Sequence, residues 1–530
     1  MRLLIRADGD GRIGGGHIMR CLSLADAARG AGHEVTFLMI DAGGGMADWV
    51  RAAGHGLILM PAQSMPAQSA SDAGDAGGAA GPDGYEDWLR QPWQQDAERS
   101  ALEALRMQAD WVVLDHYGID RRWVAALRAR VPDVRLMAFD DLDDRALGAD
   151  LLLDQTRLGA APRRHRALAR LSGPYFALLR PEFAAARPAA LARRGGEIGR
   201  ILIAPGMMDA AGLAPLALDA VARWNARTPA APLRAEVVMG SPSQSRAAVE
   251  ARAAQDRDLC LTLDATDMAA RMGAADLCIG AGGTTSWERC CLGLPTLTIA
   301  VSDNQRPGVA ALAEAGAAVA LSLKDARDPA RLDAALAEAI SRSATLAAAA
   351  AQICDGRGAA RVVAALGGAL RPLRADDAEQ LFAWRNQPHI RAASLSADPL
   401  EWEGHVAWVA RAAQREDAVF CIYSEAGRDL GLVSAVLRAK GDWHWSFYIG
   451  AAEAPKGAGG RMLAAFLRKM AARRDVQALS AEVLPQNTAS LRLHEALGFT
   501  AAPSAPDSRA LAFRLPTWDV RDRLALPAAN

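Results

Sequence analysis

Short apolar runs alternate with helical patterns along the first two thirds of the chain. Strands are predicted at residues 2–7, 35–40, 111–114, 135–139 and 151–153, and an amphipathic helix at 18–29. A second series of strands is predicted at residues 201–203, 235–239, 277–279 and 296–300. Apolar strands separated by helices are typical of parallel sheets covered on both faces. The pattern predicts two Rossmann-like α/β lobes, residues 1–192 and 193–366, with a ligand cleft between them.

Two segments depart from this alternation. Residues 63–84 are rich in Ala, Ser, Gly, Asp and Pro and have no periodicity, which predicts a flexible surface insertion. After residue 368 the strands adjoin directly, at 418–424, 431–438 and 443–449. This spacing predicts an antiparallel meander in a separate α+β domain, residues 369–530.

Composition and charge narrow the range of partners. The chain has 530 residues, of which 51% are hydrophobic, and a formal net charge of −1. This balance gives no electrostatic basis for nucleic acid or an anionic membrane as the main partner. The seven cysteines are odd in number and contain no CxxC pair, which favours reduced thiols. With no signal peptide or long apolar run, we expect a cytoplasmic protein, and the sequence indicates no oligomeric state.

A glycine-rich loop joins the first predicted strand to the first helix. Gly14 and Gly16 permit close approach of a ligand, and the start of a helix offers free N–H groups to an anion. His17 adds a group that exchanges a proton near neutral pH. The alternative is an ordinary strand–helix turn in which His17 caps the helix.

A second loop of this kind follows the strand predicted at 277–279. Its glycines and hydroxyls suit a diphosphate, and the carboxylate one turn into the helix could accept from ribose hydroxyls. These residues are Gly282, Gly283, Thr284, Thr285 and Glu288. Beyond the next strand, Asn304 and Gln305 are placed to contact a sugar.

Several stretches of the first 365 residues carry a family resemblance. They are residues 6–9, 13–21, 140–141, 178–183, 275–294 and 303–305. In these stretches the chain resembles the UDP-2,4-diacetamido-2,4,6-trideoxy-β-L-altropyranose hydrolases of pseudaminic acid biosynthesis. That family has the two-lobed GT-B fold and is similar to the glycosyltransferase that completes lipid II.

The resemblance implies roles for the loop residues. His17 would be the catalytic histidine, and the segment from Gly282 to Glu288 would bind UDP. Asn304 and Gln305 would contact the sugar, and Arg6, Asp8, Gly14 and Gly16 are further substrate-binding candidates. Water would attack the anomeric carbon with inversion, and we expect Asp8 to hold the imidazole. At residues 204–209 the chain reads Ala-Pro-Gly-Met-Met-Asp where the family pattern has a Gly-Gly-Ser/Thr-Asp type of turn.

The C-terminal region carries a second pair of motifs. Residues 455–463 open a helix after a strand, and residues 484–499 read Leu-Pro-Gln-Asn-Thr-Ala-Ser-Leu-Arg-Leu-His-Glu-Ala-Leu-Gly-Phe. Together they resemble the GNAT acetyltransferase superfamily, which implies acetyl-CoA as co-substrate and no metal. The candidate acetyl-CoA residues are Lys456, Gly457, Gly459, Gly460, Arg461, Asn487 and Ser490. The subgroup that N-acetylates UDP-4-amino-4,6-dideoxy-N-acetyl-β-L-altrosamine is similar in a further set of positions. They are Trp384-Arg385-Asn386 and Ile390-Arg391, followed by His405 and Trp408.

His494 stands where many GNAT enzymes have a tyrosine that protonates the departing CoA thiolate. The hypothesis is that His494 takes this role, and the alternative is a histidine on the helix surface. Glu482 and His444 are further candidates for a base that deprotonates the substrate amine.

The leading interpretation is a bifunctional enzyme with a small-molecule UDP-sugar substrate. Its C-terminal domain would acetylate the 4-amino group, and the N-terminal half would then remove UDP. A MurG-like glycosyltransferase fused to a GNAT domain is the first alternative, and it would need an acceptor-binding or membrane-facing patch in the first lobe. A non-catalytic nucleotide-sugar-binding module is the second alternative, and His17 argues against it.

Overall fold

The computed structural model describes residues 1–10, 13–41, 45–62, 85–156, 158, 165, 169–425, 427–504 and 508–525. The chain divides into two compact units. Unit 1 contains Met1–Leu153, Pro162–Leu171 and Val362–Asn530, and unit 2 contains Asp154–Ala161 and Ser172–Arg361. The insertion predicted at residues 63–84 lies outside the described residues.

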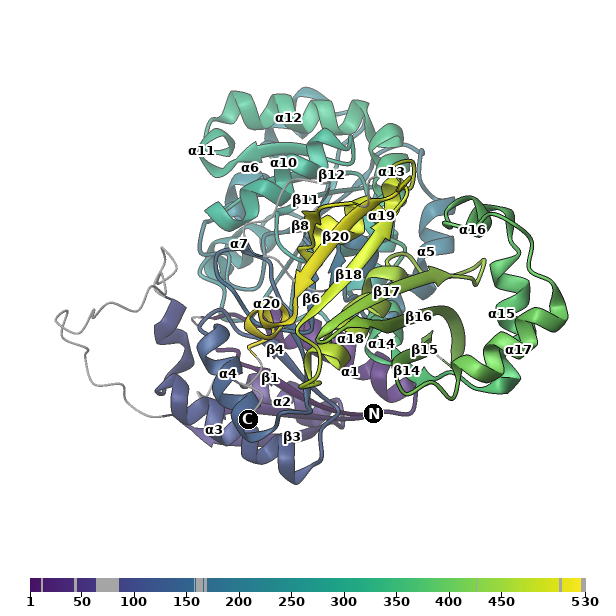
Figure 1. Ribbon diagram of the computed structural model, residues 1–530. Coiled ribbons are helices and arrows are strands. Elements are labelled where there is room, and N and C mark those ends of the chain that lie inside the picture. Colours follow the sequence, from purple (N-terminus) through teal and green to yellow (C-terminus); the bar gives the residue numbers. More distant parts are fainter. Residues whose placement is uncertain are drawn as a thin grey trace. The chain divides into compact units, whose positions relative to one another are not determined.

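The first sheet belongs to the N-terminal lobe of unit 1 (Figure 1). Its strand order is β3-β2-β1-β4-β5-β6-β7. The strands are β1 (Arg2–Ala7), β2 (Glu34–Asp41), β3 (Gly56–Pro61), β4 (Trp111–Asp115), β5 (Arg135–Phe139), β6 (Leu151–Asp154) and β7 (Ala169–Ser172). The helices are α1 (Gly16–Gly30), α2 (Met46–Ala52), α3 (Trp93–Arg106), α4 (Arg121–Arg130) and the 3-10 helix η1 (Tyr85–Leu89). Because α3 and α4 cover one face of this sheet, apolar residues such as Val112 and Trp123 share one core.

The second sheet forms unit 2 and has the order β10-β9-β8-β11-β12-β13, with every pair parallel. Its strands are β8 (Arg200–Ala204), β9 (Arg234–Met239), β10 (Leu259–Leu263), β11 (Leu277–Ala281), β12 (Thr296–Ala300) and β13 (Val319–Ser322). Ile201 and Ile203 face one apolar cluster, and Leu202 and Ala204 face the other. Strands buried on both faces in this way need an unbroken apolar sequence, which explains the short apolar runs.

Helices α5 to α13 cover the two faces of the second sheet, and α14 follows them in the chain. They are α5 (Pro181–Ala192), α6 (Leu213–Arg227), α7 (Arg246–Ala253), α8 (Met268–Ala274), α9 (Thr285–Cys291), α10 (Arg306–Glu314), α11 (Leu323–Ala326), α12 (Pro329–Ser341), α13 (Ser343–Ile353) and α14 (Gly358–Leu366). Two 3-10 helices, η2 (Pro174–Phe176) and η3 (Asp303–Gln305), complete the set. Helix α14 leads from unit 2 into unit 1.

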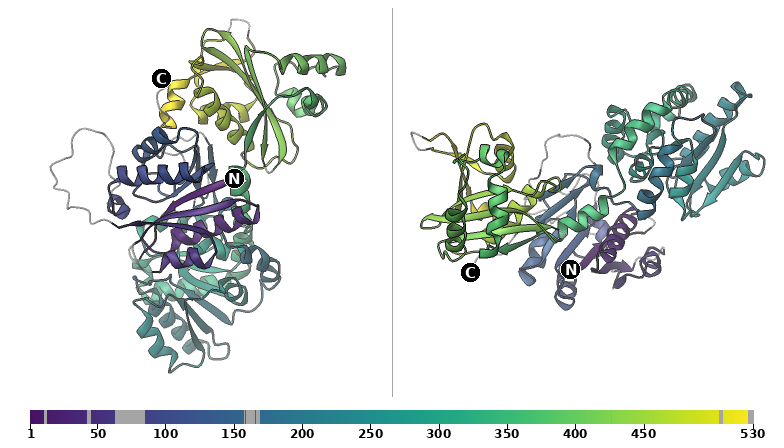
Figure 2. Two further views of the ribbon diagram at one scale, coloured as in Figure 1. Left: turned by 90° about the horizontal axis from the view of Figure 1, so that it is seen from below. Right: turned by 90° about the vertical axis from the view of Figure 1, so that its right-hand side faces the viewer.

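The third sheet, also in unit 1, is mixed and has the order β14-β15-β16-β17-β18-β20-β19. Its strands are β14 (Ala369–Pro372), β15 (Ala418–Glu425), β16 (Arg428–Ala439), β17 (Asp442–Ile449), β18 (Ala478–Val483), β19 (Thr500–Ala502) and β20 (Leu511–Pro516). The helices are α15 (Ala378–Arg385), α16 (Pro388–Ala392), α17 (Trp402–Ala412), α18 (Ala458–Ala471), α19 (Thr488–Leu497), α20 (Thr517–Arg523) and the 3-10 helix η4 (Ala375–Asp377). Figure 2 shows this twisted sheet in green and yellow with helices packed against it.

The observed elements confirm the predicted α/β lobes and the α+β domain. The strands predicted at residues 2–7 and 296–300 have the same bounds as β1 and β12, and β15, β16 and β17 form the predicted antiparallel meander. Strands β3, β7, β10, β13, β14, β18, β19 and β20 were not predicted from the sequence, and most of them are short or have mixed polarity. No helix in the described part of the chain has the length and apolar character needed to cross a membrane.

The compact units divide the chain earlier than the predicted joint at residues 192/193. Helix α5 lies in unit 2, where Phe183 and Ala190 enter the same apolar cluster as Cys291. Arg187 on this helix donates to the carbonyl oxygens of Ala351 at 2.6 Å and Cys354 at 3.0 Å. These contacts attach α5 to the second sheet, although the predicted boundary between residues 192 and 193 assigns this helix to the first lobe.

Candidate active sites

His17 is the second residue of α1 and is held by a carboxylate at the end of β4. Its Nδ1 lies 2.6 Å from Oδ1 of Asp115, and the His17 residue is 8% exposed. Since an ionised carboxylate only accepts hydrogen bonds, Nδ1 carries the hydrogen and Nε2 keeps the free lone pair. The pair therefore has the geometry of an imidazole base oriented by an acid.

Arg20, one turn further along α1, keeps Asp115 ionised. It donates to both oxygens of this carboxylate at 2.6 and 2.5 Å, and to Asp141 at 2.5 Å. Burial by itself would raise the pKa of Asp115, but the charges of Arg20 and His17 outweigh it and hold that pKa well below its usual value. A permanently ionised Asp115 stabilises the imidazolium that forms when His17 takes a proton.

The prediction that Asp8 holds the imidazole is wrong. Asp8 accepts from Arg6 at 2.8 Å and from the backbone N–H of Ile40 at 2.7 Å. Arg6 also donates to Asp96, and the side chains of Arg6 and Asp96 are fully buried. Arg6 and Asp8, both predicted to bind substrate, thus belong to an ion-pair network in the core of the lobe. They stabilise β1 beneath the loop that follows it.

The sequence places Asp115 directly after an apolar run, but it does not indicate which side chain Asp115 contacts. It ends one of the apolar runs, and β1 pairs in parallel with β4 so that Ala7 lies opposite Asp115. Because α1 follows β1, its first turn begins close to the end of β4. Only this strand order, β1 beside β4, brings His17 to Asp115.

An aromatic group lies beside His17 that the sequence did not indicate. The ring of Tyr117 meets the imidazole edge-to-face at 4.8 Å, and Trp88 stacks on Tyr117 at 5.7 Å. The hydroxyl of Tyr117 donates to Asp141 at 3.0 Å. Burial, and then the negative charge of Asp141, raise the pKa of Tyr117 well above its usual value, so the phenol stays neutral. Aromatic faces of this kind pack on the apolar face of a sugar ring.

The glycine loop before His17 keeps its surface open. Gly14 has a φ of +81°, a conformation that favours glycine, and no atom lies within 4 Å of a Cβ placed on Gly14 or on Gly16. Gly14 N–H donates to the carbonyl of Asp10 at 2.8 Å. No neighbouring atom therefore fills the space beside these two glycines at the start of α1.

In unit 2, hydrogen bonds from Arg289 stabilise the loop between β11 and α9. This buried guanidinium donates to the carbonyl of Ala281 at 2.7 Å and to the Ser286 hydroxyl at 2.8 Å. A Cβ on Gly282 would lie 2.2 Å from Val309, so only glycine fits there, whereas a Cβ on Gly283 would meet no atom within 4 Å. Gly282, Gly283, Thr284 and Thr285 therefore form one short, open turn.

Glu288 on α9 is the titratable group of this loop. Burial raises its pKa to about 7, against the opposing charges of Arg180 and Arg289. Its carboxylate lies 3.7 Å from the guanidinium of Arg180, a residue of the stretch at 178–183. A buried carboxylate whose pKa is raised toward neutrality is a candidate for a functional site.

The residues predicted to contact the sugar lie in η3, directly after β12. The Gln305 side chain accepts from the backbone N–H of Val301 at 3.2 Å, and its Cβ lies 3.5 Å from the position of a Cβ on Gly282. The structure therefore brings Gln305 and the glycine turn together. Asn304 is in the same 3-10 helix.

In the third sheet, β17 and β18 are parallel neighbours over only three residue pairs, which end at His444 and Ser480. Beyond these residues β17 continues to Ile449 and leads through Lys456 to α18. A strand that loses its neighbour offers unpaired backbone groups to an extended ligand. The segment that follows this strand turns at Gly457, which caps α18, and Gly459 and Gly460 lie in the first turn of that helix.

Two regions of the chain match models of known families. Residues 225–363 match the glycosyltransferase family 28 C-terminal domain, and residues 369–500 match the acetyltransferase (GNAT) domain. The chain therefore contains one region similar to family 28 glycosyltransferases and a second region similar to GNAT acetyltransferases. No curated protein matches the chain.

Several solved structures are similar to parts of this chain. Acinetobacter baumannii MurG is 15% identical with a TM-score of 0.47, covering 68% of this chain and 98% of its own. The spinosyn rhamnosyltransferase SpnG is 19% identical with a TM-score of 0.43, covering 68% and 99%. The aminoglycoside acetyltransferase AAC(6')-Ib, in complex with coenzyme A and kanamycin, is 17% identical with a TM-score of 0.27, covering 29% and 98%.

Within the GNAT domain, Arg461 has a partner other than the predicted pyrophosphate. Its guanidinium donates to both oxygens of the buried Glu425 at 2.6 and 2.9 Å, and to the carbonyl of Lys456 at 3.0 Å. Burial opposes its charge, but Glu425 outweighs burial and raises the pKa of Arg461. Arg461 thus stabilises the turn through hydrogen bonds to other protein groups. Lys456 is the basic residue of this turn that we assign to contact with a ligand.

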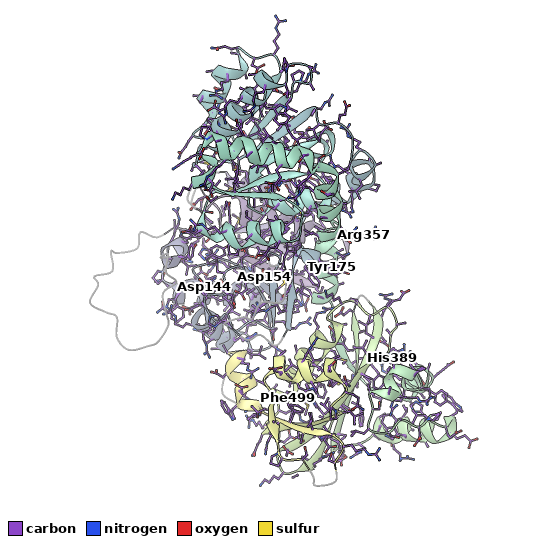
Figure 3. All side chains as sticks on the ribbon, turned by 90° about the horizontal axis from the view of Figure 1, so that it is seen from above. Asp144, Asp154, Tyr175, Arg357, His389 and Phe499 are labelled. Carbon is purple, nitrogen blue, oxygen red and sulfur yellow. The ribbon has the colours of Figure 1, made fainter. Side chains whose placement is uncertain are left out.

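His494 lies inside the GNAT domain and not on a helix surface. It is 1% exposed, its Nε2 accepts from the indole N–H of Trp445 at 3.0 Å, and its Nδ1 donates to the carbonyl of Ser490 at 2.8 Å. The rings of Phe499 and Phe513 pack against it, and Phe499 is labelled in the yellow region of Figure 3. Burial lowers the pKa of His494. With both nitrogens engaged, the imidazole is neutral and has no proton directed at a thiolate.

Of the remaining candidates in this region, Asn487 and Glu482 have local partners. Asn487 caps α19 by accepting from the backbone N–H of Ser490 at 3.1 Å. Glu482 pairs with Arg438 at 3.1 Å, and burial lowers the pKa of His444. His444 has a buried Nδ1 without a hydrogen-bond partner among the described residues. Because Glu482 is paired with Arg438, His444 is the better placed of the two candidate bases.

Proposed function

We propose that this chain catalyses two consecutive steps on one nucleotide sugar. The GNAT domain uses acetyl-CoA to N-acetylate UDP-4-amino-4,6-dideoxy-N-acetyl-β-L-altrosamine. The N-terminal half then hydrolyses the resulting UDP-2,4-diacetamido-2,4,6-trideoxy-β-L-altropyranose to free sugar and UDP, a step of pseudaminic acid biosynthesis. The observation that carries the hydrolase assignment is the His17–Asp115 pair with its 2.6 Å contact.

In the hydrolysis step, His17 acts as the general base. Its Nε2 takes a proton from water as the water oxygen bonds to the anomeric carbon, and Asp115 stabilises the resulting imidazolium. The bond from the anomeric carbon to the diphosphate oxygen breaks, and UDP leaves with inversion at that carbon. Gly282, Gly283, Thr284 and Thr285 are assigned to the diphosphate and Glu288 to the ribose hydroxyls, with Asn304 and Gln305 assigned to the sugar.

In the acetylation step, the neutral 4-amino group attacks the thioester carbonyl of acetyl-CoA. An amide bond forms, the bond from carbon to sulfur breaks, and CoA leaves as its thiol after taking up a proton. The opening between β17 and β18 is assigned to the pantetheine arm, and Lys456 with the glycine turn is assigned to the pyrophosphate. A water molecule next to His444 is assigned to removal of the amine proton.

A glycosyltransferase is the second candidate for the N-terminal half, and the family 28 match over residues 225–363 favours it. In that reaction His17 would take the proton from an acceptor hydroxyl, and the sugar would be transferred to the acceptor. The two reactions differ in product, since hydrolysis yields a free reducing sugar without any added acceptor.

One coupled assay tests the proposal. The UDP-4-amino sugar and acetyl-CoA are supplied, and free CoA, UDP and reducing sugar are followed separately. We expect CoA first and then UDP with an equal amount of reducing sugar. CoA release without UDP would reject the hydrolase, and UDP release that requires an added acceptor would establish the glycosyltransferase. His17→Ala should stop UDP release and leave CoA release intact. His55→Ala is its matched control, because His55 pairs with Asp26 at 2.9 Å elsewhere in the same lobe.

A further inference from the structure

A cavity of about 440 Å³ opens within unit 2 at the amino ends of β8, β9 and β10. Pockets for small molecules have volumes of roughly 300–1,000 Å³, so this cavity is large enough to hold one. The strands of this sheet are parallel, and the loops assigned to UDP and to the sugar follow β11 and β12 at the carboxyl ends. The cavity therefore lies at the opposite edge of the same sheet.

The register of the strands places charged residues together on one face of the sheet. Arg200 and Arg234 are Cα partners on β8 and β9. Two residues after Arg234, Glu236 is the partner of Cys260 on β10. Residues in register, and residues two apart on one strand, point to the same face. Arg200, Arg234, Glu236 and Cys260 therefore share one face, and all four line the cavity.

Helix α8 covers only part of this face. Its residue Arg271 pairs with Glu236 and donates to the hydroxyl of Thr262 at 3.0 Å. The helix has seven residues and ends at Ala274, which lines the cavity. The Arg271–Glu236 pair thus forms one wall, and the sheet nearer the amino ends of the strands is left open.

Positive charge is in excess around the cavity. Arg234 pairs with Asp258 at 3.3 Å, so its charge is partly balanced. Arg200 and Arg257 also line the cavity, and neither guanidinium has a hydrogen-bond or ion-pair partner in the part of the chain that the structure describes. Four arginines therefore face two carboxylates, which leaves two positive charges without a counterion.

The spacing of the arginines favours a bound anion. Arg200 and Arg234 stand on neighbouring strands, which lie about 4.8 Å apart. Like charges this close repel each other, and an anion between them removes the repulsion. Guanidinium groups present pairs of N–H donors that match the oxygens of a phosphate. A phosphate group is therefore the anion that this arrangement fits.

The remaining lining suits a polyhydroxylated organic group. An ionised carboxylate has more acceptor positions than one arginine uses, so Glu236 and Asp258 can each still accept from hydroxyl groups. Leu202 and Ala274 add apolar surface beside them. Hydroxyl groups and a phosphate occur together in sugar phosphates.

We propose that this cavity binds a small sugar phosphate, with Arg200 and Arg257 contacting the phosphate and the carboxylates of Glu236 and Asp258 accepting from the sugar hydroxyls. Binding is reversible, and no bond forms or breaks. The inference does not depend on the proposed function, because no residue of the cavity is assigned to UDP, to the nucleotide sugar or to acetyl-CoA.

Alkylation of Cys260 tests whether the cavity binds such a ligand. All seven cysteines lie in the described part of the chain, where Cys260 is exposed and the other six are buried. The full chain is treated with iodoacetamide at constant ionic strength, with or without ribose 5-phosphate or glucose 1-phosphate, and modification of Cys260 is followed by mass spectrometry. At ten times the dissociation constant of the ester, we expect modification to slow about tenfold, because the bound ester covers the thiol.

Calorimetry gives the dissociation constants and detects binding that leaves the thiol accessible. Inorganic phosphate should bind about tenfold more weakly than the better ester, because it lacks the hydroxyl groups that the carboxylates accept. Equal affinity for inorganic phosphate and for that ester would overturn the assignment to a sugar phosphate. If neither ester gives heat or protection of Cys260, the site itself is overturned.

Arg200→Met and Arg257→Met test where the ester binds. Each removes one cation and keeps an apolar stem, and we expect each to weaken ester binding about tenfold. Arg246→Met is the matched control, because Arg246 pairs with Glu250 at 2.7 Å on α7, away from the cavity. Wild-type affinity in both cavity variants would overturn the proposal. Modification of Cys260 without ligand at the same rate in all variants shows that the cavity itself is intact.

Discussion

Nδ1 of His17 lies 2.6 Å from Oδ1 of Asp115, and Arg20 binds the same carboxylate. A carboxylate that is permanently ionised orients the imidazole and stabilises it after proton uptake. Asp115, which no motif had identified, therefore decides whether His17 can act as a base.

Asp115→Asn is expected to lower the rate of UDP release by roughly 10²- to 10⁴-fold, the range for loss of an acid–base group or of its orienting partner. The amide keeps the size of the side chain but presents no full negative charge to the imidazolium. CoA release by the GNAT domain should stay unchanged. Asp26→Asn, which alters the carboxylate paired with His55, serves as the control. UDP release at the wild-type rate in Asp115→Asn would refute the proposed base.

UDP binding should depend on pH through Glu288, whose pKa burial raises to about 7. If the ionised carboxylate accepts from the ribose hydroxyls, UDP lowers this pKa and affinity rises with pH. Below pH 7 we expect about a tenfold loss of affinity per pH unit, the limit for one linked proton. Calorimetry in buffers of different ionisation enthalpy should show proton release on UDP binding near neutral pH.

Glu288→Gln should remove that dependence, and Glu182→Gln, which alters a carboxylate near the same Arg180, should retain it. The free protein has its own linked effect. Since the folded pKa of Glu288 is above its usual value of 4.5, this group contributes stability at low pH that is lost as pH rises toward 7. Thermal unfolding of Glu288→Gln should therefore lack this loss. A wild-type pH profile of UDP affinity in Glu288→Gln would contradict the assignment.

The role of His494 can be separated from its packing by His494→Gln. Loss of a ring from this aromatic cluster should cost about 2–4 kcal/mol of stability, in the range for large-to-small core substitutions and broken buried hydrogen bonds. The pH dependence of CoA release should keep its wild-type shape, because a neutral buried imidazole does not supply the proton. Disappearance of the alkaline limb of that profile would show that His494 is the general acid.

Arg461 and Lys456 should respond differently to removal of their charges. Arg461→Met leaves the buried Glu425 without a partner and should destabilise the GNAT domain by about 3–5 kcal/mol. Lys456→Ala should raise the KM for acetyl-CoA several-fold with no loss of stability, because it removes one cation near the pyrophosphate. Lys440→Ala, at an exposed turn of the same domain, is the control for lost surface charge. A normal KM in Lys456→Ala would exclude the pyrophosphate contact.

By itself, the sequence determined the alternation of strands and helices, the change to an α+β domain near residue 369, and the loops that hold Gly14, Gly282 and Gly457. These features are local, because hydrophobic periodicity and glycine turns are properties of neighbouring residues. Only the tertiary structure decided which side chains meet. It paired His17 with Asp115 and not Asp8, enclosed His494 among aromatic rings, and gave Arg461 to Glu425. Each of these contacts depends on strand order and helix packing between residues far apart in the chain. Local sequence patterns do not contain this information.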